Sequence, residues 1–353
     1  MTAPTQTAAP TSKRKPNVFD VARLAGVSQT TVSFVLNGST SPRISEATSR
    51  RVHEAVKQLG YRPNTLARSL AHGKTLTVGL VLPCFDDDFH GRIVKECQNR
   101  LAENGYQLLF VHAAIGSAAE ARMVEFLLQH RVDAIACFVH SATTYVLPEW
   151  LRTINSAGIP AVVIDNMTSP DQADSVCSDD MAGMDTVVEH LYGLGHREIA
   201  ILAAKWPEDL VPIKVKGFEA AMRQRGLTPR LVAEDVTSPS SALFSAEMLR
   251  LMGSPNPPTA FVAHNDYQFE DFLQNHAGRD VRVPEEISLV GYGDSYLSRM
   301  MRLTTVGQQP DLTGRTVAER LLDRLENPQA PAKRTEIPTE LLVRGSTAAP
   351  ARR

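Results

Sequence analysis

Residues 17–37 read NVFDVARLAGVSQTTVSFVLN, and this stretch predicts two short helices joined by a tight turn. The first helix carries an apolar stripe at helical spacing, made of Val18, Val21, Ala22 and Ala25. Gly26 can adopt the left-handed conformation that ends a helix, and Ser28 stands where a second helix needs an N-cap. The buried face of that second helix is expected to consist of Val32, Val35 and Leu36.

Two short helices joined by a three-residue turn that contains glycine make a helix-turn-helix. The second helix leaves four side chains outside its apolar face, namely Gln29, Thr30, Ser33 and Phe34. Base reading in a DNA major groove requires hydrogen-bonding groups on the first turn of such a helix. By spacing alone, an ordinary helical hairpin fits these residues equally well.

The residues that follow predict a third helix and then a very short fourth one. Ser45 can cap the third helix, whose apolar positions are Val52, Ala55, Val56 and Leu59, and Gly60 and Pro63 end it. Asn64 can cap the fourth, which spans barely two turns and carries Leu66, Ala67 and Leu70 on one side. So short a helix is marginal in water because nucleation is costly, so it needs a partner to form.

Several motifs in this chain, taken in order, resemble the lactose-repressor (LacI/GalR) family of bacterial transcriptional regulators. The head carries DVARLAGVS at 20–28, TVSFVLN at 31–37, LGYRPN at 59–64 and ARSLA at 67–71. The match continues with GLGHR at 193–197, ND at 265–266, VPEEISLVGY at 283–292, LTTV at 303–306 and LVRGST at 342–347. The resemblance therefore covers roughly residues 17–347, and the head motif is highly specific.

The charge of the chain is unevenly distributed, although the formal net charge is only −2. Residues 1–75 hold 11 Lys and Arg against three acidic residues, a net charge of +8. The remaining residues hold 26 basic and 36 acidic side chains, a net charge of −10. A basic head on an acidic body suits a protein that binds a phosphate backbone at one end only.

The cysteine pattern and the N-terminus predict a cytoplasmic protein. Cys84, Cys97, Cys137 and Cys177 show no CxxC pairing and lie mostly in apolar runs, which indicates reduced core thiols. No apolar run approaches the roughly 18 residues that a membrane span needs. Residues 1–16 lack an apolar segment of the signal-peptide kind and are expected to form a disordered basic arm.

Beyond residue 75, short apolar runs alternate with helical segments, which predicts parallel sheets covered on both faces. The expected fold is a small all-α helix-turn-helix head plus an α/β bilobed body of two doubly wound parallel-sheet subdomains. The resemblance implies an architecture shared with periplasmic binding proteins, with three crossings between lobes, placed near Asp165, Gln309 and Asn327.

The expected divisions are an arm at 1–16, a head at 17–62, a hinge helix and linker at 63–74, a body at 75–347 and a tail at 348–353. Within the body, the first lobe is expected at 75–165 and 309–327, and the second at 166–308 and 328–347.

The resemblance assigns DNA contacts to the second helix of the head. Gln29 and Thr30 lead this helix and are expected to carry most of the base reading. Phosphate contacts or support of the helix ends are expected from Ser28, Thr31, Ser33 and Asn37. Phe34 departs from the family pattern, since many members have Arg there to read guanine. Its ring can pack on a thymine methyl group, or it can lie buried against the hinge.

The resemblance also implies that two hinge helices pair in the minor groove and that Leu70 wedges between base pairs. Such a wedge costs stacking energy but bends the duplex onto more protein surface. Folding of the hinge would then be coupled to operator binding. Arg68 would lie along the same groove, although it could instead be solvated, and Leu70 could instead be core between head and body.

Effectors are expected in the crevice outside the carboxyl ends of the strands. The candidates for effector binding are Phe89, His90, Asp165, Lys214, Asn265, Asp294 and Gln308. Asp165 and Asn265 suit hydroxyl-rich ligands but could equally cap helices. The acidic run at 86–88 more plausibly forms a solvated loop than a metal site, and the sequence predicts no cofactor.

Two positions depart from the family pattern at this crevice. Lys214 stands where most relatives carry an Arg that grips the ligand in a fork, and Lys cannot reproduce that bidentate geometry. Gly293 stands where relatives usually have the first of two acidic residues. The sequence therefore does not predict an ordinary hexose as the effector. A phosphorylated or acidic sugar, a nucleoside, or no small ligand remain alternatives.

The sequence contains no motif of an enzyme class. It lacks a GxSxG elbow, a Walker loop and an HExxH motif, and the glycines at 291 and 293 lack the third glycine of a dinucleotide-binding loop. A solute-binding protein fits the body but does not explain the basic head. The sequence therefore predicts a homodimeric transcription regulator, a repressor, that binds a near-palindromic operator and responds to a small sugar-like effector.

Overall fold

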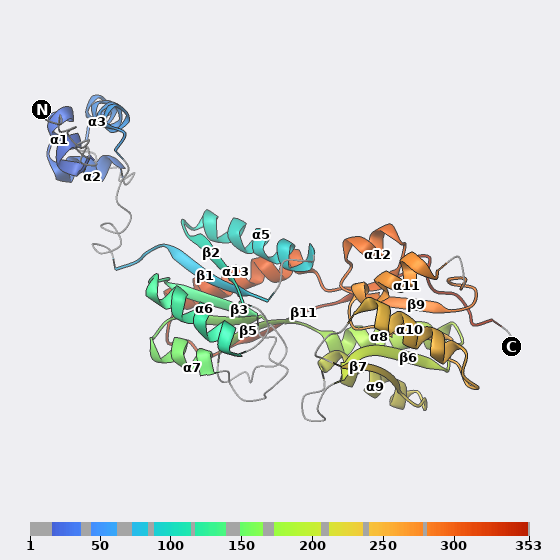
Figure 1. Cartoon of the computed structure of the whole chain (residues 1–353). Coiled ribbons are helices and arrows are strands. Elements are labelled where there is room, and N and C mark those ends of the chain that lie inside the picture. Colours follow the sequence, from blue (N-terminus) through green and yellow to red (C-terminus); the bar gives the residue numbers. More distant parts are fainter. Residues whose placement is uncertain are drawn as a thin grey trace, which may run out of the picture. The chain divides into compact units, whose positions relative to one another are not determined.

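The computed structural model describes residues 16–36, 44–61, 73–83, 88–113, 117–138, 149–164, 173–205, 212–235, 240–277 and 281–351. The chain divides into two compact units, Met1–Thr75 and Leu76–Arg353. Figure 1 shows the helices and strands of each unit.

The described residues of the first unit form three helices, α1 (Val18–Ala25), α2 (Gln29–Leu36) and α3 (Glu46–Leu59). The predicted turn is confirmed, because Gly26 has a φ of 65° and its amide donates to the last carbonyls of α1. The Ser28 hydroxyl accepts the Thr31 amide at 3.1 Å, so it caps α2 as expected. Ser45 caps α3 in the same way.

The three helices share one small apolar core. Its fully buried members are Val21, Ala22, Ala25, Val32, Val52 and Ala55. The apolar stripes expected from the sequence therefore face one another, and a simple two-helix hairpin is excluded. The opposite face of α2 is left to solvent.

The described residues of the second unit form two sheets, as the sequence predicted, and each sheet has six strands, including β5, β7, β11 and β12, which the sequence did not predict. The first has the strand order β11-β5-β4-β3-β1-β2 and is parallel throughout. Its strands are β1 (Thr77–Leu82), β2 (Gln107–His112), β3 (Ala134–Phe138), β4 (Ala161–Ile164), β5 (Asp174–Ser178) and β11 (Arg334–Ile337).

The second sheet has the order β12-β10-β9-β8-β6-β7, with only β12 antiparallel to its neighbour. Its strands are β6 (Ile199–Lys205), β7 (Arg230–Asp235), β8 (Ala260–Ala263), β9 (Ser288–Tyr292), β10 (Thr304–Gly307) and β12 (Glu340–Leu342).

Helices cover both faces of each sheet (Figure 1). On the first sheet, α5 (Asp88–Glu103) and α13 (Pro310–Glu326) pack on one face, and α6 (Ser117–Gln129) and α7 (Glu149–Ser156) pack on the other. On the second sheet, α8 (Asp180–Gly193) and α9 (Ile213–Gln224) face α10 (Ser241–Met252) and α11 (Glu270–Asn275) across the strands. The short helices η2 (Asp266–Phe269) and α12 (Tyr296–Met300) lie after the ends of β8 and β9. We call the two layered bodies the first lobe and the second lobe.

The chain crosses between the lobes at residues 178–180, 307–310 and 337–340. The predicted crossing near Gln309 is therefore confirmed, but those near Asp165 and Asn327 are wrong, along with the lobe boundaries drawn from them. Both errors have one cause: β5 and β11 belong to the first sheet but contain few apolar residues. Neither strand therefore gives the apolar run by which a buried parallel strand is recognised.

A buried ion cluster explains how the polar strand β5 is tolerated in the first lobe. The Asp174 side chain is fully buried and accepts hydrogen bonds from Arg324 at 2.8 and 3.0 Å, from Arg320 at 3.3 Å and from the Lys333 amide at 2.6 Å. Burial alone would raise the pKa of this carboxyl, but its hydrogen bonds and the two arginine charges hold that pKa below its ordinary value. The cluster ties α13 and the segment before β11 to β5.

The cysteines of the described residues behave as predicted. Cys97, Cys137 and Cys177 are buried free thiols, and burial raises the pKa of Cys97 to about 12. Cys84 lies outside the described residues. Among the helices of the described ranges, none is long and apolar enough to cross a membrane.

Candidate functional site

The exposed face of α2 presents the polar side chains that the sequence predicted. Ser28, Gln29, Thr30 and Ser33 are exposed, while Val32 below them is fully buried. The hydroxyls of Ser28 and Thr31 lie 2.9 Å apart and hold the start of the helix. Gln29 and Thr30 therefore lie on a capped first turn, with their side chains exposed to solvent.

Phe34 lies one turn further along the same face, and its side chain is 45% exposed. An exposed phenyl ring on the polar face of a helix is available for contact with a partner surface, such as a thymine methyl group. Asn37, Arg68 and Leu70 lie outside the described residues.

The predicted effector residues follow the carboxyl ends of strands in the second unit. Phe89 and His90 lie in the first turn of α5, Lys214 lies in the first turn of α9, and Gln308 follows β10. Asp165 lies outside the described residues. His90 is buried, and its ring lies 4.8 Å from that of Phe138 at the end of β3.

Four side chains at these strand ends form a connected chain. The Lys214 ammonium lies 4.1 Å from the centre of the Tyr292 ring and donates to the His264 carbonyl at 3.3 Å. The Tyr292 hydroxyl donates to Asp180 at 2.8 Å. Gln308 donates to the same Asp180 oxygen at 3.3 Å. The structure therefore links Lys214 to Gln308 through two residues that sequence reasoning did not assign.

Burial of Tyr292 and the nearby Asp180 carboxylate raise the pKa of the Tyr292 hydroxyl well above its ordinary value. The hydroxyl therefore stays protonated and acts as a hydrogen-bond donor. The amide of Gln308 also reaches Ser178, the last residue of β5, at 3.2 Å. This contact places Gln308 against the first crossing between the lobes. Tyr292 ends the VPEEISLVGY motif, which was a signal that could have marked it.

Asp294 and Asn265 have their oxygens engaged within the second lobe. Asp294 accepts from Arg344 at 2.5 Å and lies 3.3 Å from Arg299. The Asn265 oxygen accepts the Gln268 amide at 3.2 Å and caps η2, which was the alternative role considered for it. These two residues are not brought into the chain that joins Lys214 and Gln308.

Gly293 has a φ of 124°, a conformation that L side chains rarely adopt. The adjacent backbone is held by the buried Asp266 carboxylate, which accepts the Ser295 amide and the Thr305 hydroxyl, each at 2.7 Å. Position 293 therefore has no acidic side chain, and its backbone conformation favours glycine.

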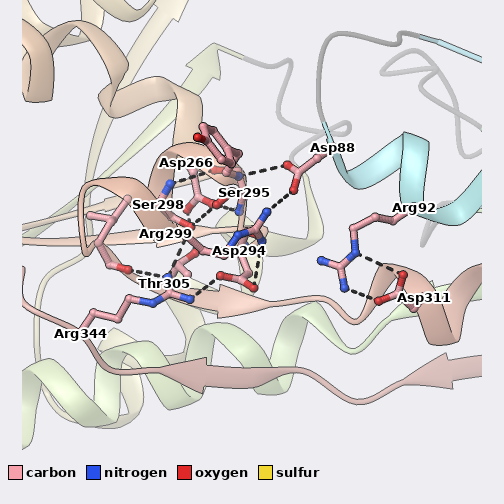
Figure 2. A network of polar contacts seen from close by, with 12 residues as sticks. Asp88, Arg92, Asp266, Asp294, Ser295, Ser298, Arg299, Thr305, Asp311 and Arg344 are labelled. Atoms are coloured by element: carbon pink, nitrogen blue, oxygen red, sulfur yellow. Dashed lines mark hydrogen bonds and ion pairs between the residues drawn. The ribbon is translucent and has the colours of Figure 1, made fainter.

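The acidic run at 86–88 was expected to be a solvated loop, and for Asp88 this expectation is wrong (Figure 2). Asp88 begins α5, and its carboxylate lies 2.6 Å from the Arg299 guanidinium and 3.2 Å from the Tyr296 amide. Both partners belong to the second lobe. Asp86 and Asp87 lie outside the described residues. Within the described ranges, no group of three or more His, Cys, Asp and Glu is arranged to hold a metal ion.

Comparison with known proteins accounts for both units. Residues 17–64 match the family model described as bacterial regulatory proteins, lacI family, and residues 188–347 match the periplasmic binding protein-like domain. The chain is 31% identical over 338 residues to the HTH-type transcriptional regulator DegA of Bacillus subtilis (strain 168), covering 94% of this chain and 98% of that protein. It is 28% identical over 335 residues to the ribose operon repressor of Escherichia coli (strain K12), covering 93% and 98% of the two chains.

The fold is also similar to a solved structure of the lac repressor dimer bound to operator and the anti-inducer ONPF. The TM-score is 0.81 at 25% identity, and the comparison covers 95% of this chain and all of that one. The helix-turn-helix, the two-sheet body and the extended sequence match agree with one another. The chain therefore belongs to the lacI family of bacterial regulatory proteins and is a DNA-binding transcriptional regulator, not an enzyme.

Proposed function

We propose that this protein is a repressor that binds a near-palindromic operator as a homodimer, with one head on each half-site. The observation that carries this proposal is the exposed polar turn of α2, which lies within a unit of net charge +8. Polar side chains on a firmly capped first turn supply base-edge contacts, and surrounding Lys and Arg supply phosphate contacts. Two-fold pairing of heads matches the symmetry of a palindromic site.

In this proposal, Gln29 and Thr30 read bases, and Ser28, Thr31, Ser33 and Asn37 contact phosphates or support the helix ends. Phe34 packs on a thymine methyl group, which its exposure supports. Leu70 wedges into the minor groove at the centre of the operator, and Arg68 lies along that groove. An apolar wedge of this kind bends the duplex and depends on two hinges acting together.

The proposed effector lies between the two lobes and is a sugar or a sugar derivative. The similarity to a ribose operon repressor supports a hydroxyl-rich ligand. The residues assigned to it are Phe89, His90, Asp165, Lys214, Asn265, Asp294 and Gln308. A change in lobe angle on binding would alter hinge pairing, so that effector and operator binding are coupled through two states of the dimer.

One observation favours a second effector class, an acidic metabolite. Lys214 supplies a point charge where a forked guanidinium would hold two hydroxyls, and position 293 has no carboxylate. The oxygens of Asp294 are meanwhile engaged by two arginines. This set of groups is better suited to a ligand that carries negative charge than to a neutral hexose.

The proposal is tested by selecting bound sites from fragmented genomic DNA and measuring affinity for the selected duplex at several salt concentrations. We expect preference for a near-palindrome, a dimer on the duplex, and affinity that falls steeply with salt. Equal binding to all duplexes, or one subunit on the preferred site, would overturn it. Genes next to the selected sites then indicate which sugars, nucleosides and acids to test as effectors.

A further inference from the structure

An ion pair joins the two lobes in addition to the three chain crossings (Figure 2). Asp88 stands in the first turn of α5, which packs on the first sheet, and Arg299 stands on α12, which follows β9 of the second sheet. The Asp88 Oδ2 atom lies 2.6 Å from the Arg299 Nη2 atom. The other oxygen, Oδ1, accepts the Tyr296 backbone amide at 3.2 Å.

The Tyr296 amide is the first of the α12 helix, so it has no partner within that helix. Asp88 supplies this partner from the opposite lobe. Both oxygens of one carboxylate are therefore used on the same short helix, which makes the contact sensitive to direction as well as to distance.

The arginine is held in place from its own side. Its Nη1 atom donates to both the backbone oxygen and the carboxylate of Asp294, the latter at 3.3 Å. The second oxygen of Asp294 accepts Arg344 at 2.5 Å, and Arg344 also donates to the Leu303 carbonyl at 2.9 Å. Contacts within the second lobe thus hold the Arg299 side chain in the position from which it contacts Asp88 of the first lobe.

We propose that Asp88 and Arg299 form a latch that holds the two lobes at the angle seen in this structure and so sets the response to effector. The proposal rests on the function proposed in the preceding section. A contact present at one lobe angle and absent at another stabilises the first state, and the population of that state determines both affinities. The pair is partly exposed, with 39% of the Arg299 side chain and 27% of the Asp88 side chain accessible, so its effect is moderate and depends on salt.

The chain offers a matched control in Arg92 and Asp311. Arg92 also lies on α5, one turn after Asp88, and its Nε atom donates to Asp311 at 3.2 Å. Asp311 stands in the first turn of α13, so this ion pair lies entirely within the first lobe. Removal of Asp311 therefore removes an ion pair of similar exposure that does not itself join the lobes.

The first test measures the distance between the lobes without any ligand. Spin labels are placed at the exposed positions Glu125 on α6 and Gln224 on α9, with Cys84 changed to serine. Asp88→Asn and Arg299→Gln are each expected to move or broaden the distance distribution, and the double variant is expected to add nothing further. Asp311→Asn should reproduce the parent distribution. Coincidence of the Asp88→Asn and Arg299→Gln distributions with the parent, or fully additive effects of the two, would overturn the latch.

The second test measures affinity for the selected operator duplex. Both latch variants are expected to change it in the same direction by about two- to tenfold, with Asp311→Asn within about twofold of the parent. A shifted lobe distance with unchanged operator affinity would show that the latch has no regulatory role. If the parent itself selects no duplex, the proposed function fails, and the distance measurement alone still decides whether the latch exists. Thermal unfolding of each variant verifies that it is folded.

Discussion

The ammonium group of Lys214 lies 4.1 Å from the centre of the Tyr292 ring, a cation–π contact inside the second lobe. Tyr292 in turn donates to Asp180, so the position of Lys214 depends on a buried tyrosine that is itself anchored. The ammonium group of Lys214 also donates a hydrogen bond to the His264 carbonyl, so its positive charge has a defined position in the second lobe. This arrangement makes Lys214 the residue whose removal tests the assigned effector site most directly.

Lys214→Ala is expected to weaken effector binding by at least about tenfold, because a hydrogen bond to a charged group is lost. Operator affinity without effector should stay within about twofold of the parent. Titration of the operator complex with the effector identified from the regulated genes measures both. Arg223→Ala, at the far end of α9, is the control. An unchanged response of Lys214→Ala would show that the effector lies elsewhere.

Gln29→Ala is expected to relax preference at one base pair of each half-site. The side chain is exposed on the first turn of α2, and a bidentate amide contact accounts for about 1–3 kcal/mol of base discrimination. Selection from randomised half-sites measures the preference, and Arg23→Ala, exposed on α1, is the control for loss of an exposed side chain of the head outside α2. Identical selected sites for parent and Gln29→Ala would remove Gln29 from base reading.

Leu70→Ser is expected to abolish operator bending while leaving the fold and sequence-independent binding intact. A serine cannot fill the space between unstacked base pairs, so the energy spent on kinking the duplex is not recovered. Fluorescence energy transfer between the two ends of a short operator duplex measures the bend. Normal bending by Leu70→Ser would assign this leucine to the core between head and body.

Asp174→Ala is expected to destabilise the body by about 3–5 kcal/mol, since it removes the carboxylate partner of Arg324 and one of the two carboxylate partners of Arg320, both of which are largely buried. The Asp174 side chain is fully buried, and the Arg320 and Arg324 side chains are 14% and 12% exposed. Asp323→Ala removes a more exposed partner of Arg320 and should cost less than about 1 kcal/mol. Equilibrium unfolding in urea measures both, and equal losses would contradict the importance of the buried cluster.

Stability of the second lobe is expected to fall as pH decreases below about 6.5, the ordinary histidine pKa. Burial lowers the pKa of His190 and His196 in the folded state, so below this pH the unfolded chain binds more protons than the folded one. The Nε2 atom of His196 donates to the Ala348 carbonyl at 2.8 Å, and its Nδ1 atom lies 2.8 Å from the Thr259 hydroxyl, so the ring ties the C-terminal segment to the sheet. Urea unfolding at pH 7.5 and 5.5 measures the change, which should shrink in a His190→Gln, His196→Gln variant. A change of equal size in that variant would assign the pH dependence to other groups.

The sequence by itself determined the elements whose causes are local. Helix α1 ends at Gly26 and α2 begins at Ser28 because a left-handed turn and a hydroxyl cap act within a few residues. The apolar strands β1, β3 and β8 are recognisable in the sequence as continuous hydrophobic runs, since both faces of a parallel sheet are buried. These signals were sufficient for the head, the two-sheet body and the family.

Only the tertiary structure decided where polar residues find partners far along the chain. Strand β5 was missed because Asp174 is neutralised by arginines 146 and 150 residues away, and Asp88 was taken for a loop residue because Arg299 is 211 residues away. Tyr292, Asp180 and Lys214 likewise come together only through packing of α8 and α9 on one sheet. The physical reason is that the free energy of a buried polar group depends on its partner, and spacing in the sequence carries no information about partners that only folding brings into contact.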